Sequence, residues 1–398
     1  MREAIYVTGA GIVSALGTNT RETLAALRSR RSGIGAIRYP DTVHTRFPVG
    51  EVKMSNAEMM QCLNIPEEEA TTRTSLMGMF AAGEAIAQAC LHEEDDLRIA
   101  LVSGTTVGGM DKSEQYYIDF LTNDTRNAYI ATHDCGACTE MIADRFGFFS
   151  MVDTVSTACS SAANAVMLGD MLIREGRADI VVAGGSECLT KFHLNGFNTL
   201  MILDEAPCRP FDATRAGLNL GEGAAYLVLE SEHTLRRRNV APLCSLAGYA
   251  NTCDAYHQTA TSPEGEGACL AMTKALESAR LNPEDIDYLN AHGTGTQNND
   301  LTEGIAIQRV FGDAIPPVSS TKAFTGHATS AAGGIEAVIS ILALQHDFIP
   351  VNLHFAVPME ELRFTPATDE KPRGALRHVM SNSFGFGGND TTLVFSKI

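Results

Sequence analysis

The sequence of 398 residues contains no tryptophan and has fewer basic than acidic residues. Its 30 lysines and arginines stand against 48 aspartates and glutamates, and the formal net charge of −18 disfavours nonspecific binding to nucleic acid over the surface as a whole. No apolar run reaches the roughly 18 residues of a membrane-spanning helix. We therefore expect neither nucleic acid nor a membrane as a partner.

The sequence also lacks low-complexity segments and Pro- or Ser-rich linkers, which indicates one continuous structural unit. The charged Glu3 and the run Gly9–Gly11 interrupt the apolar N-terminus, which we interpret as a first core strand and turn instead of a secretion signal. Ten cysteines without such a signal predict free thiols in a reducing cytoplasm.

Strand-like and helix-like runs alternate along the chain, a pattern that predicts an α/β fold. In the first half, a strand over 151–158 is followed by a helix over 160–175 and a buried strand over 179–185. In the second half, a strand over 286–291 leads through a Gly/Thr loop into a helix over 299–311. The second half thus repeats the order of elements of the first.

Two segments in different halves resemble each other: "ACSSAANAVML" from Ala158 and "ATSAAGGIEAVISI" from Ala328. Both open a helix with small residues. Small residues let two helices approach closely, so we expect these helices to pack against each other inside a sheet sandwich. The likeness hints at an internal duplication with a boundary near residue 240; chance similarity between alanine-rich helices is the alternative.

Cys159 lies between a strand-like run and the first turn of the predicted helix. Unpaired backbone N–H groups at a helix N-terminus favour a thiolate and can hold a developing oxyanion. The alternative is a buried small apolar residue, which is the usual role of a free cysteine. Position alone leaves both interpretations open.

Two histidines stand at similar junctions. His292 follows an apolar strand and opens the loop "HGTGT", and His327 precedes a small-residue helix, five residues after Lys322. A single histidine is more often structural, but the carboxyl ends of strands are where α/β sheets bind ligands, so the recurrence indicates a site. The glycine loop "SFGFGG" over 383–388 brings backbone close to another group or forms a simple tight turn.

Three other patterns are weaker. "TGAGIVSALG" resembles the start of a dinucleotide-binding fingerprint, but Ser14 replaces its third glycine and no acidic residue follows at the required distance. Cys135 and Cys138 form one CxxC without the second pair of a zinc site. Cys159 and His292 have the separation found in papain-like proteases, yet the signature around that cysteine is absent.

Five motifs occur together in the order and spacing typical of β-ketoacyl-acyl-carrier-protein synthases: "TACSS", "RPFDATRAGLNLGEGAAYLVLE", "NAHGTGTQNNDLTE", "KAFTGHATSAAGGIEA" and "SNSFGFGGND". The chain therefore resembles the condensing enzymes of the thiolase superfamily over essentially its whole length. It looks most like the elongating ketoacyl synthase II type and its polyketide-synthase relatives. The initiating type, which uses Cys-His-Asn, fits less well.

This resemblance implies a five-layer α-β-α-β-α sandwich built from two duplicated βαβαβαββ halves. We expect an N-terminal half over 1–240 that carries the nucleophile and a C-terminal half over 241–398 that carries the other catalytic residues and the gate loop. It also implies a homodimer and an acyl carrier protein as partner. No cofactor is expected, because the phosphopantetheine arm arrives on the carrier.

The implied reaction is a decarboxylative Claisen condensation that extends an acyl chain by two carbons. Cys159 would carry the acyl group as a thioester, with the backbone N–H groups of Cys159 and Phe386 as oxyanion hole. His292 and His327 would donate hydrogen bonds to the enolate formed when malonyl loses CO2. Lys322 would keep both imidazoles neutral.

The same resemblance assigns supporting roles. Lys322 would be oriented by Glu336 or Glu303. Thr294 and Thr296 match positions that bind the pantetheine arm. A second set of residues matches the acyl side of the site: Phe384 and Phe386 as the gate, and Val107 in the acyl pocket.

The chain departs from its relatives where a carrier would dock. Arg73 stands alone near Glu67, Glu68 and Glu69, where relatives of primary fatty-acid synthesis carry a basic cluster. This leaves room for a specialised polyketide or polyene pathway beside fatty-acid elongation, and for a heterodimer with a related subunit. A non-catalytic chain-length factor would lack the nucleophile, and a thiolase would need a second catalytic cysteine near the last glycine loop.

Overall fold

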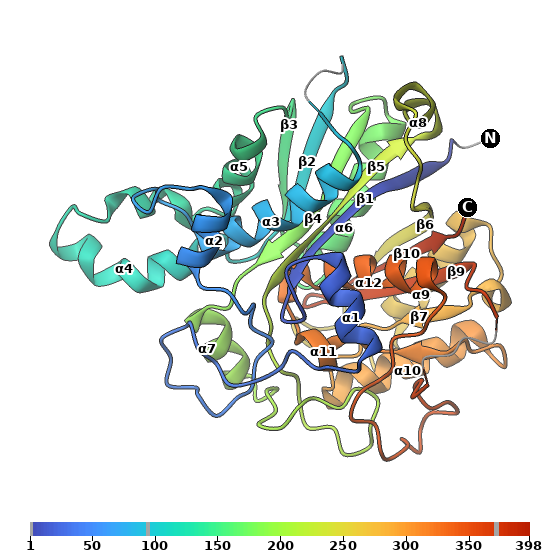
Figure 1. Cartoon of the computed structure of the whole chain (residues 1–398). Helices are drawn as coiled ribbons and strands as arrows, with labels where there is room; N and C mark the ends of the chain where they lie inside the picture. The colour runs from blue at the N-terminus through green and yellow to red at the C-terminus, as the bar shows by residue number, and fades with distance from the viewer. Residues whose placement is uncertain (1–2, 93–95, 370–373) are drawn as a thin grey trace.

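The computed structural model describes residues 3–92, 96–369 and 374–398. Alternating apolar residues form strands, and small-residue or amphipathic runs form the helices between them (Figure 1). The strands are β1 Ile5–Ser14, β2 Ile99–Gly104, β3 Met151–Val155, β4 Ile180–Glu187, β5 Gly223–Ser231, β6 Cys244–Cys253, β7 Tyr288–Asn290, β8 Val318–Ser319, β9 His378–Gly385 and β10 Asn389–Ser396.

The helices surround these strands, and several of them were expected from the sequence. They are α1 Thr20–Arg28, α2 Asn56–Leu63, α3 Arg73–Gln88, α4 Met110–Thr122, α5 Cys135–Phe146, α6 Ser161–Arg174, α7 Lys191–Thr199, α8 Glu232–Arg238, α9 Glu266–Ala279, α10 Gln297–Phe311, α11 Lys322–Thr325 and α12 Ala332–His346. None of the described helices is both long enough and apolar enough to cross a membrane.

The ten strands form one hydrogen-bonded sheet in the order β3-β2-β4-β5-β1-β6-β10-β9-β7-β8. Each half contributes five strands, and when they are numbered within their own half both read 3-2-4-5-1 from the outer edge toward the shared centre. The directions also agree, because in each half the first three pairs from the outer edge are parallel, parallel and antiparallel. The two halves meet where Tyr6 and Val7 of β1 pair with Ser245 and Cys244 of β6.

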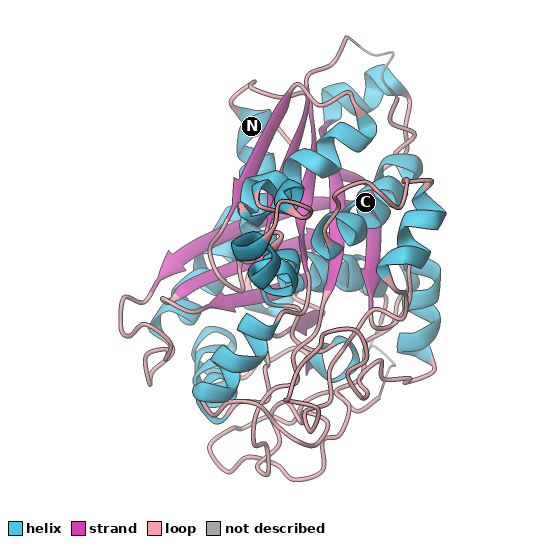
Figure 2. Cartoon of the chain, turned by 90° about the vertical axis from the view of Figure 1, so that its left-hand side faces the viewer, coloured by secondary structure: helices cyan, strands magenta, loops and turns pink. Residues whose placement is uncertain are grey.

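The two halves of this sheet lie on either side of a central pair of helices, so each half forms a layer of its own. With the outer helices the molecule has five layers, as the resemblance implied. Helices α3 and α5 cover the outer face of the first half, α9 and α10 cover the outer face of the second, and α6 and α12 lie between them (Figures 1 and 2). In strand β4, alternate side chains point to opposite faces and fill two different layers of the core. Val181 and Ala183 pack in the central core, while Ile180 and Val182 pack in the outer core under α3.

The two small-residue helices form the central layer and touch closely. A Cβ atom on Gly333 of α12 would lie 2.9 Å from Cβ of Ala163 on α6, so any larger residue would push the helices apart. Every residue of α12 from Ala332 to Leu344 is buried. The prediction that these two helices pack against each other is confirmed, and their loops are thereby brought together.

Candidate active site

Cys159 lies in the turn between β3 and α6. The strand ends at Val155, three residues before its predicted end, because Ala158 adopts a left-handed conformation with a φ of 53°. This turn places Cys159 two residues before the first residue of α6. The side chain is 5% exposed.

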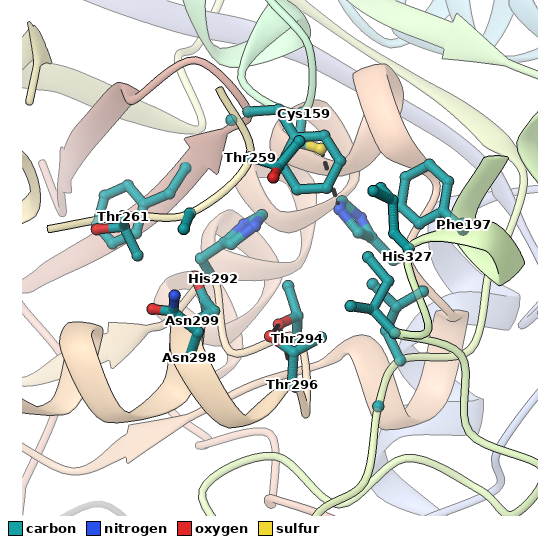
Figure 3. Close-up of a pocket in the computed structure, with 18 of the residues that line it drawn as sticks. Cys159, Phe197, Thr259, Thr261, His292, Thr294, Thr296, Asn298, Asn299 and His327 are labelled. Atoms are coloured by element: carbon teal, nitrogen blue, oxygen red, sulfur yellow. Dashed lines mark hydrogen bonds between the residues drawn. The ribbon is translucent and has the colours of Figure 1, made fainter. Parts of the chain in front are cut away.

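Two imidazoles from the second half reach the same place. His292 follows β7, and His327 lies between α11 and α12. Nε2 of His327 lies 3.2 Å from Sγ of Cys159, and the two imidazole rings are 5.2 Å apart at 85° (Figure 3). The predicted convergence of one sulfur and two imidazoles is therefore what the fold produces.

Lys322 determines which nitrogen of His292 carries the proton. Its ammonium donates to the backbone carbonyl of His292 at 2.5 Å, lies 3.3 Å from Nδ1 of the same residue, and forms an ion pair with Glu336. An ammonium only donates, so Nδ1 is the acceptor and the proton of the neutral ring is on Nε2. Lys322 thus makes His292 a hydrogen-bond donor at Nε2.

The two carboxylates suggested for Lys322 have different partners. Glu336 is the one that pairs with Lys322. Glu303 instead accepts hydrogen bonds from the backbone N–H groups of His292, at 2.9 Å, and Gly293, at 2.7 Å. Burial raises the pKa of Glu336 to about 7 and that of Glu303 to about 6. Glu303 therefore fixes the backbone that carries His292, and Glu336 fixes the cation.

The site holds its nucleophile and its imidazoles in uncharged forms. Burial, followed by the charge of Lys322, lowers the pKa of both His292 and His327 well below the usual range. Burial also raises the pKa of the Cys159 thiol to about 12, although Lys322 and the N–H of Phe386 act in the opposite direction. Burial therefore opposes the thiolate that the helix position favours, and the uncharged thiol is the form that this balance supports.

The glycine loop between β9 and β10 closes over the sulfur. The backbone N–H of Phe386 acts on the Cys159 sulfur and lowers the pKa of the thiol, against the larger effect of burial. A Cβ atom on Gly385 would lie 2.9 Å from the carbonyl oxygen of Thr157, so the loop packs directly on the nucleophile turn. Asn389 accepts from Ser160 Oγ at 2.7 Å and ties the end of the loop to the start of α6. The loop is thus built into the site and is more than a tight turn.

A pocket of about 420 Å³ opens beside these groups. Phe384 lies 5.8 Å from His292, ring centre to ring centre, and Phe386 stacks on Phe197 of α7 at 5.7 Å. Thr294 and Thr296 line the pocket, with their hydroxyl oxygens 2.8 Å apart. The other lining residues are Leu200, Met201, Ile202, Ala216, Gly217, Leu218, Thr259, Ala260, Thr261, Gln297, Asn298, Asn299, Gly385, Gly387, Gly388 and Asp390.

Several of these residues were not found by sequence reasoning. Phe197, the segment 200–202 and the segment 259–261 come from loops and a short helix without a distinctive motif. Asp390 belongs to the last of the five motifs but was not predicted as a site residue, although an acidic residue next to a glycine loop indicates a functional position. Val107 does not line this pocket; its N–H donates to Glu187 at 3.0 Å, and its acyl-pocket role stays a prediction.

Arg73 is not available to a carrier protein. It is 5% exposed, and its guanidinium lies 2.6 Å from Glu222. The guanidinium also donates to the carbonyl oxygens of Val52 and Met54. The lone basic residue of this region is therefore part of the core, which agrees with the expectation that this region offers an acidic carrier little basic surface.

Comparison with known proteins agrees with this geometry. Residues 2–234 match the N-terminal domain of the β-ketoacyl synthase family, and residues 243–356 match its C-terminal domain. The chain is 33% identical to 3-oxoacyl-[acyl-carrier-protein] synthase 2 of Staphylococcus aureus (strain COL), with 99% of this chain and 98% of that protein covered. It is 34% identical to nodulation protein E of Rhizobium meliloti (strain 1021), with both chains covered completely.

Solved structures show the same architecture. The ishigamide ketosynthase/chain length factor matches with a TM-score of 0.92 and 30% identity, with all of both chains covered. A ketosynthase in complex with its chain length factor from Xenorhabdus doucetiae matches with a TM-score of 0.83 and 30% identity over 100% of this chain and 98% of that one. With its sulfur, paired imidazoles and glycine loop in one pocket, the chain belongs to the β-ketoacyl synthase family and is a condensing enzyme.

Proposed function

We propose that this enzyme joins an acyl group held on Cys159 to a malonyl group on an acyl carrier protein. The product is a 3-oxoacyl-carrier thioester two carbons longer. The observation that carries the assignment of roles is the 3.2 Å approach of His327 Nε2 to the Cys159 sulfur, with the His292 ring beside it. A thiol in contact with an imidazole is the arrangement that nucleophilic catalysis needs.

In the first step, the Cys159 sulfur attacks the carbonyl carbon of an acyl-carrier thioester. The thiol proton passes to Nε2 of His327, and from there to the departing carrier thiolate as the C–S bond breaks. The oxygen of the tetrahedral intermediate is held by the backbone N–H groups of Cys159 and Phe386. Support for this comes from the N–H of Phe386, which already favours negative charge on the Cys159 sulfur by lowering the pKa of the thiol.

In the second step, a malonyl-carrier binds and its carboxylate leaves as CO2. The electron pair of the broken C–C bond moves into the thioester, and Nε2–H of His292 and His327 stabilise the enolate oxygen. The carbanion then attacks the acyl carbonyl, and Cys159 leaves as a thiolate that takes up one proton from solvent to restore the resting thiol. After the first step the ring proton of His327 is on Nδ1, because Nε2 has passed its proton to the carrier thiolate. Nδ1 has no hydrogen-bond partner among the described residues, so the ring can exchange this proton for one on Nε2, through solvent, before it donates to the enolate.

We assign the carrier protein as the partner that delivers both substrates. One similar structure, with 25% identity and a TM-score of 0.88, is described as a type II polyketide synthase acyl-carrier protein in complex with its ketosynthase. The steps above use only side chains, backbone N–H groups and the arm on the carrier. We therefore propose that no resident cofactor takes part, and the ten free cysteines of the described chain support a reducing, cytoplasmic setting.

We also propose that two copies of the chain pair through the edge strand β3 and helix α4. Strand β3 ends the sheet, and its Val152 side chain is 39% exposed. None of the side chains of α4 is buried against the described part of the chain, and Tyr117, Ile118 and Leu121 are exposed. Light scattering of the purified chain alone tests this, because a monomer that dimerises only with a related subunit would establish the heterodimer.

The decisive experiment is intact mass spectrometry of the enzyme after exposure to a panel of acyl-carriers. The wild type should gain one acyl mass on Cys159, and the preferred chain separates fatty-acid elongation from a polyketide or polyene pathway. Cys159→Ala should gain no acyl mass while malonyl-carrier decarboxylation persists. Condensation at the wild-type rate by Cys159→Ala would overturn the proposal.

A further inference from the structure

Asp390 is a buried carboxyl group in the wall of the catalytic pocket that the reaction above does not use. It is the second residue of β10, directly after the glycine loop, and it lines the same pocket as Cys159. The residue is 2% exposed. Its Oδ2 atom is fully buried and has no hydrogen-bond partner among the residues that the structure describes. An unpartnered buried carboxyl oxygen is costly, so this group needs an explanation.

A second carboxyl group lies next to it. Asp254 follows β6, and its carboxylate accepts hydrogen bonds from the backbone N–H groups of Tyr256, at 3.2 Å, and Ser262, at 2.9 Å. Oδ2 of Asp390 and Cβ of Asp254 lie 2.2 and 2.8 Å from the point where a Cβ atom of Gly267 would stand. The two aspartates are therefore neighbours at the start of α9, and only a glycine fits between them.

The pair lies where two walls of the pocket meet. One wall is the glycine loop over 385–388, and the other is the segment 259–261. The walls are joined by two backbone hydrogen bonds, from Asp254 N to Gly388 O at 3.1 Å and from Gly387 N to Gln258 O at 2.8 Å. The first of these bonds starts at the backbone of Asp254 itself, and a Cβ atom on Gly388 would lie 2.1 Å from Oδ1 of Asp254, so the charge of the pair acts on this joint.

The charged groups around Asp390 are mostly acidic. Asp254 from the end of β6 and Glu303 from α10 face it, and together with burial, the largest cause, they raise the pKa of Asp390 to about 8. Glu266, which begins α9, is exposed and paired with Arg309. The remaining titratable side chains nearby are His257, whose Nδ1 accepts from Thr259 N, His292 across the pocket, and the exposed Cys253.

We propose that Asp390 is a positioning residue that keeps the two walls of the pocket together, and that it does so as an uncharged carboxylic acid beside the Asp254 carboxylate. When Asp390 loses its proton, its buried carboxylate and the partly exposed carboxylate of Asp254 repel each other, and no described cation faces Asp390. The glycine loop then separates from the segment 259–261. The effect on substrate binding rests on the proposed function, because the glycine loop carries the N–H of Phe386.

Hydrogen exchange of the wild-type dimer or monomer tests the joint without any assay of activity. Protection factors of peptides that cover 254–262 and 385–390 are compared between about pH 5.5 and about pH 9.5, after correction for intrinsic exchange. The open joint gives Asp390 an ordinary pKa, so protection should fall by up to about tenfold per pH unit as the pH rises toward the closed-state pKa of Asp390, about 8. Protection should level off above this midpoint, because Asp390 is then ionised in the closed and the open joint alike. The KM for malonyl-carrier should rise over the same range, while kcat changes less.

Three variants make the test specific. Asp390→Asn should remove the pH dependence of protection and of KM. Asp254→Asn should move the midpoint to lower pH, since one neighbouring negative charge is gone. Glu266→Gln is the matched control, because it removes a carboxylate from the same helix end that does not face Asp390, and it should leave the midpoint unchanged.

Two results would overturn the proposal: protection independent of pH in the wild type, or the same decline in Asp390→Asn. If Asp390→Asn fails to fold, the shifted midpoint in Asp254→Asn still decides the matter. The joint could instead open as expected while the enzyme fails to condense acyl groups with malonyl-carrier. That result would refute the proposed function and leave this inference standing.

Discussion

Nε2 of His327 lies 3.2 Å from the sulfur of Cys159, and neither group is charged. The nucleophile is therefore generated by proton transfer within the pair when substrate arrives, and not by prior ionisation. This arrangement protects a buried thiolate from premature reaction, since the thiolate exists only while the acyl carbonyl is in place.

The first prediction concerns the pH dependence of the thiol. Because the pKa of Cys159 is raised to about 12, alkylation by iodoacetamide should accelerate about tenfold per pH unit between about pH 7 and about pH 10, without a plateau. Peptide mass spectrometry follows this residue separately from the exposed Cys62. A plateau below about pH 8 would show that the resting enzyme holds a thiolate.

The second prediction concerns the buried ion pair between Lys322 and Glu336. Lys322→Ala leaves a carboxylate buried without its cation, and we expect a loss of about 3–5 kcal/mol in the free energy of unfolding, measured in urea. Malonyl-carrier decarboxylation should also slow, since His292 loses the group that holds its proton on Nε2. The double variant Lys322→Met/Glu336→Leu should regain most of the stability but not the decarboxylation. Recovery of both would show that Lys322 has only a structural role.

The third prediction asks whether acylation depends on the contact between the glycine loop and the turn that carries Cys159, or only on strain in the backbone of the loop. Gly385→Ala introduces a methyl group 2.9 Å from Thr157 O and 3.2 Å from the N atom of Cys159, so it moves the loop away from the nucleophile. Acylation of Cys159 should slow by about 10²–10³, the usual effect of losing one oxyanion donor. Gly387→Ala is the control, because its φ of 85° costs about 1–2 kcal/mol in stability while its added methyl meets no atom within 4 Å of the described chain. Similar acylation rates in the two variants would contradict the role of the loop.

The fourth prediction concerns Arg73. Its removal in Arg73→Ala should lower the free energy of unfolding by about 3–5 kcal/mol, because Glu222 stays buried without a partner. The affinity for carrier protein, measured by calorimetry below the melting temperature, should not change. A weaker carrier affinity in a fully folded variant would show that Arg73 does take part in docking.

Local patterns predicted much of the fold. The strand-to-helix junctions before α6 and α12 were visible because apolar runs end in small polar residues, and the contact of Gly333 with Ala163 follows from the size of those residues. The early end of β3 was not predictable, because it depends on the left-handed conformation of Ala158, a residue that rarely adopts it.

Site residues with a distinctive side-chain chemistry were predicted from the sequence. Properties that depend on burial, such as the protonation state or accessibility of a side chain, were predicted less well. Cys159, His292 and His327 were found from their junctions and motifs. The choice of Glu336 over Glu303 as partner of Lys322 depends on distances across the fold. The state of the thiol and the burial of Arg73 depend on how completely water is excluded, and a sequence does not state that.

The repeated strand order has a further consequence. Cys159 follows the third strand of one half, and His327 follows the third strand of the other half, so the distance between them is set across the boundary between two halves with the same strand order. A small sliding of one half of the chain past the other would break the 3.2 Å contact between His327 and Cys159 long before either half unfolded. The close contact of Gly333 with Ala163 resists that shear. A methyl group added at Gly333 would push the two helices apart and so change the distance between His327 and Cys159.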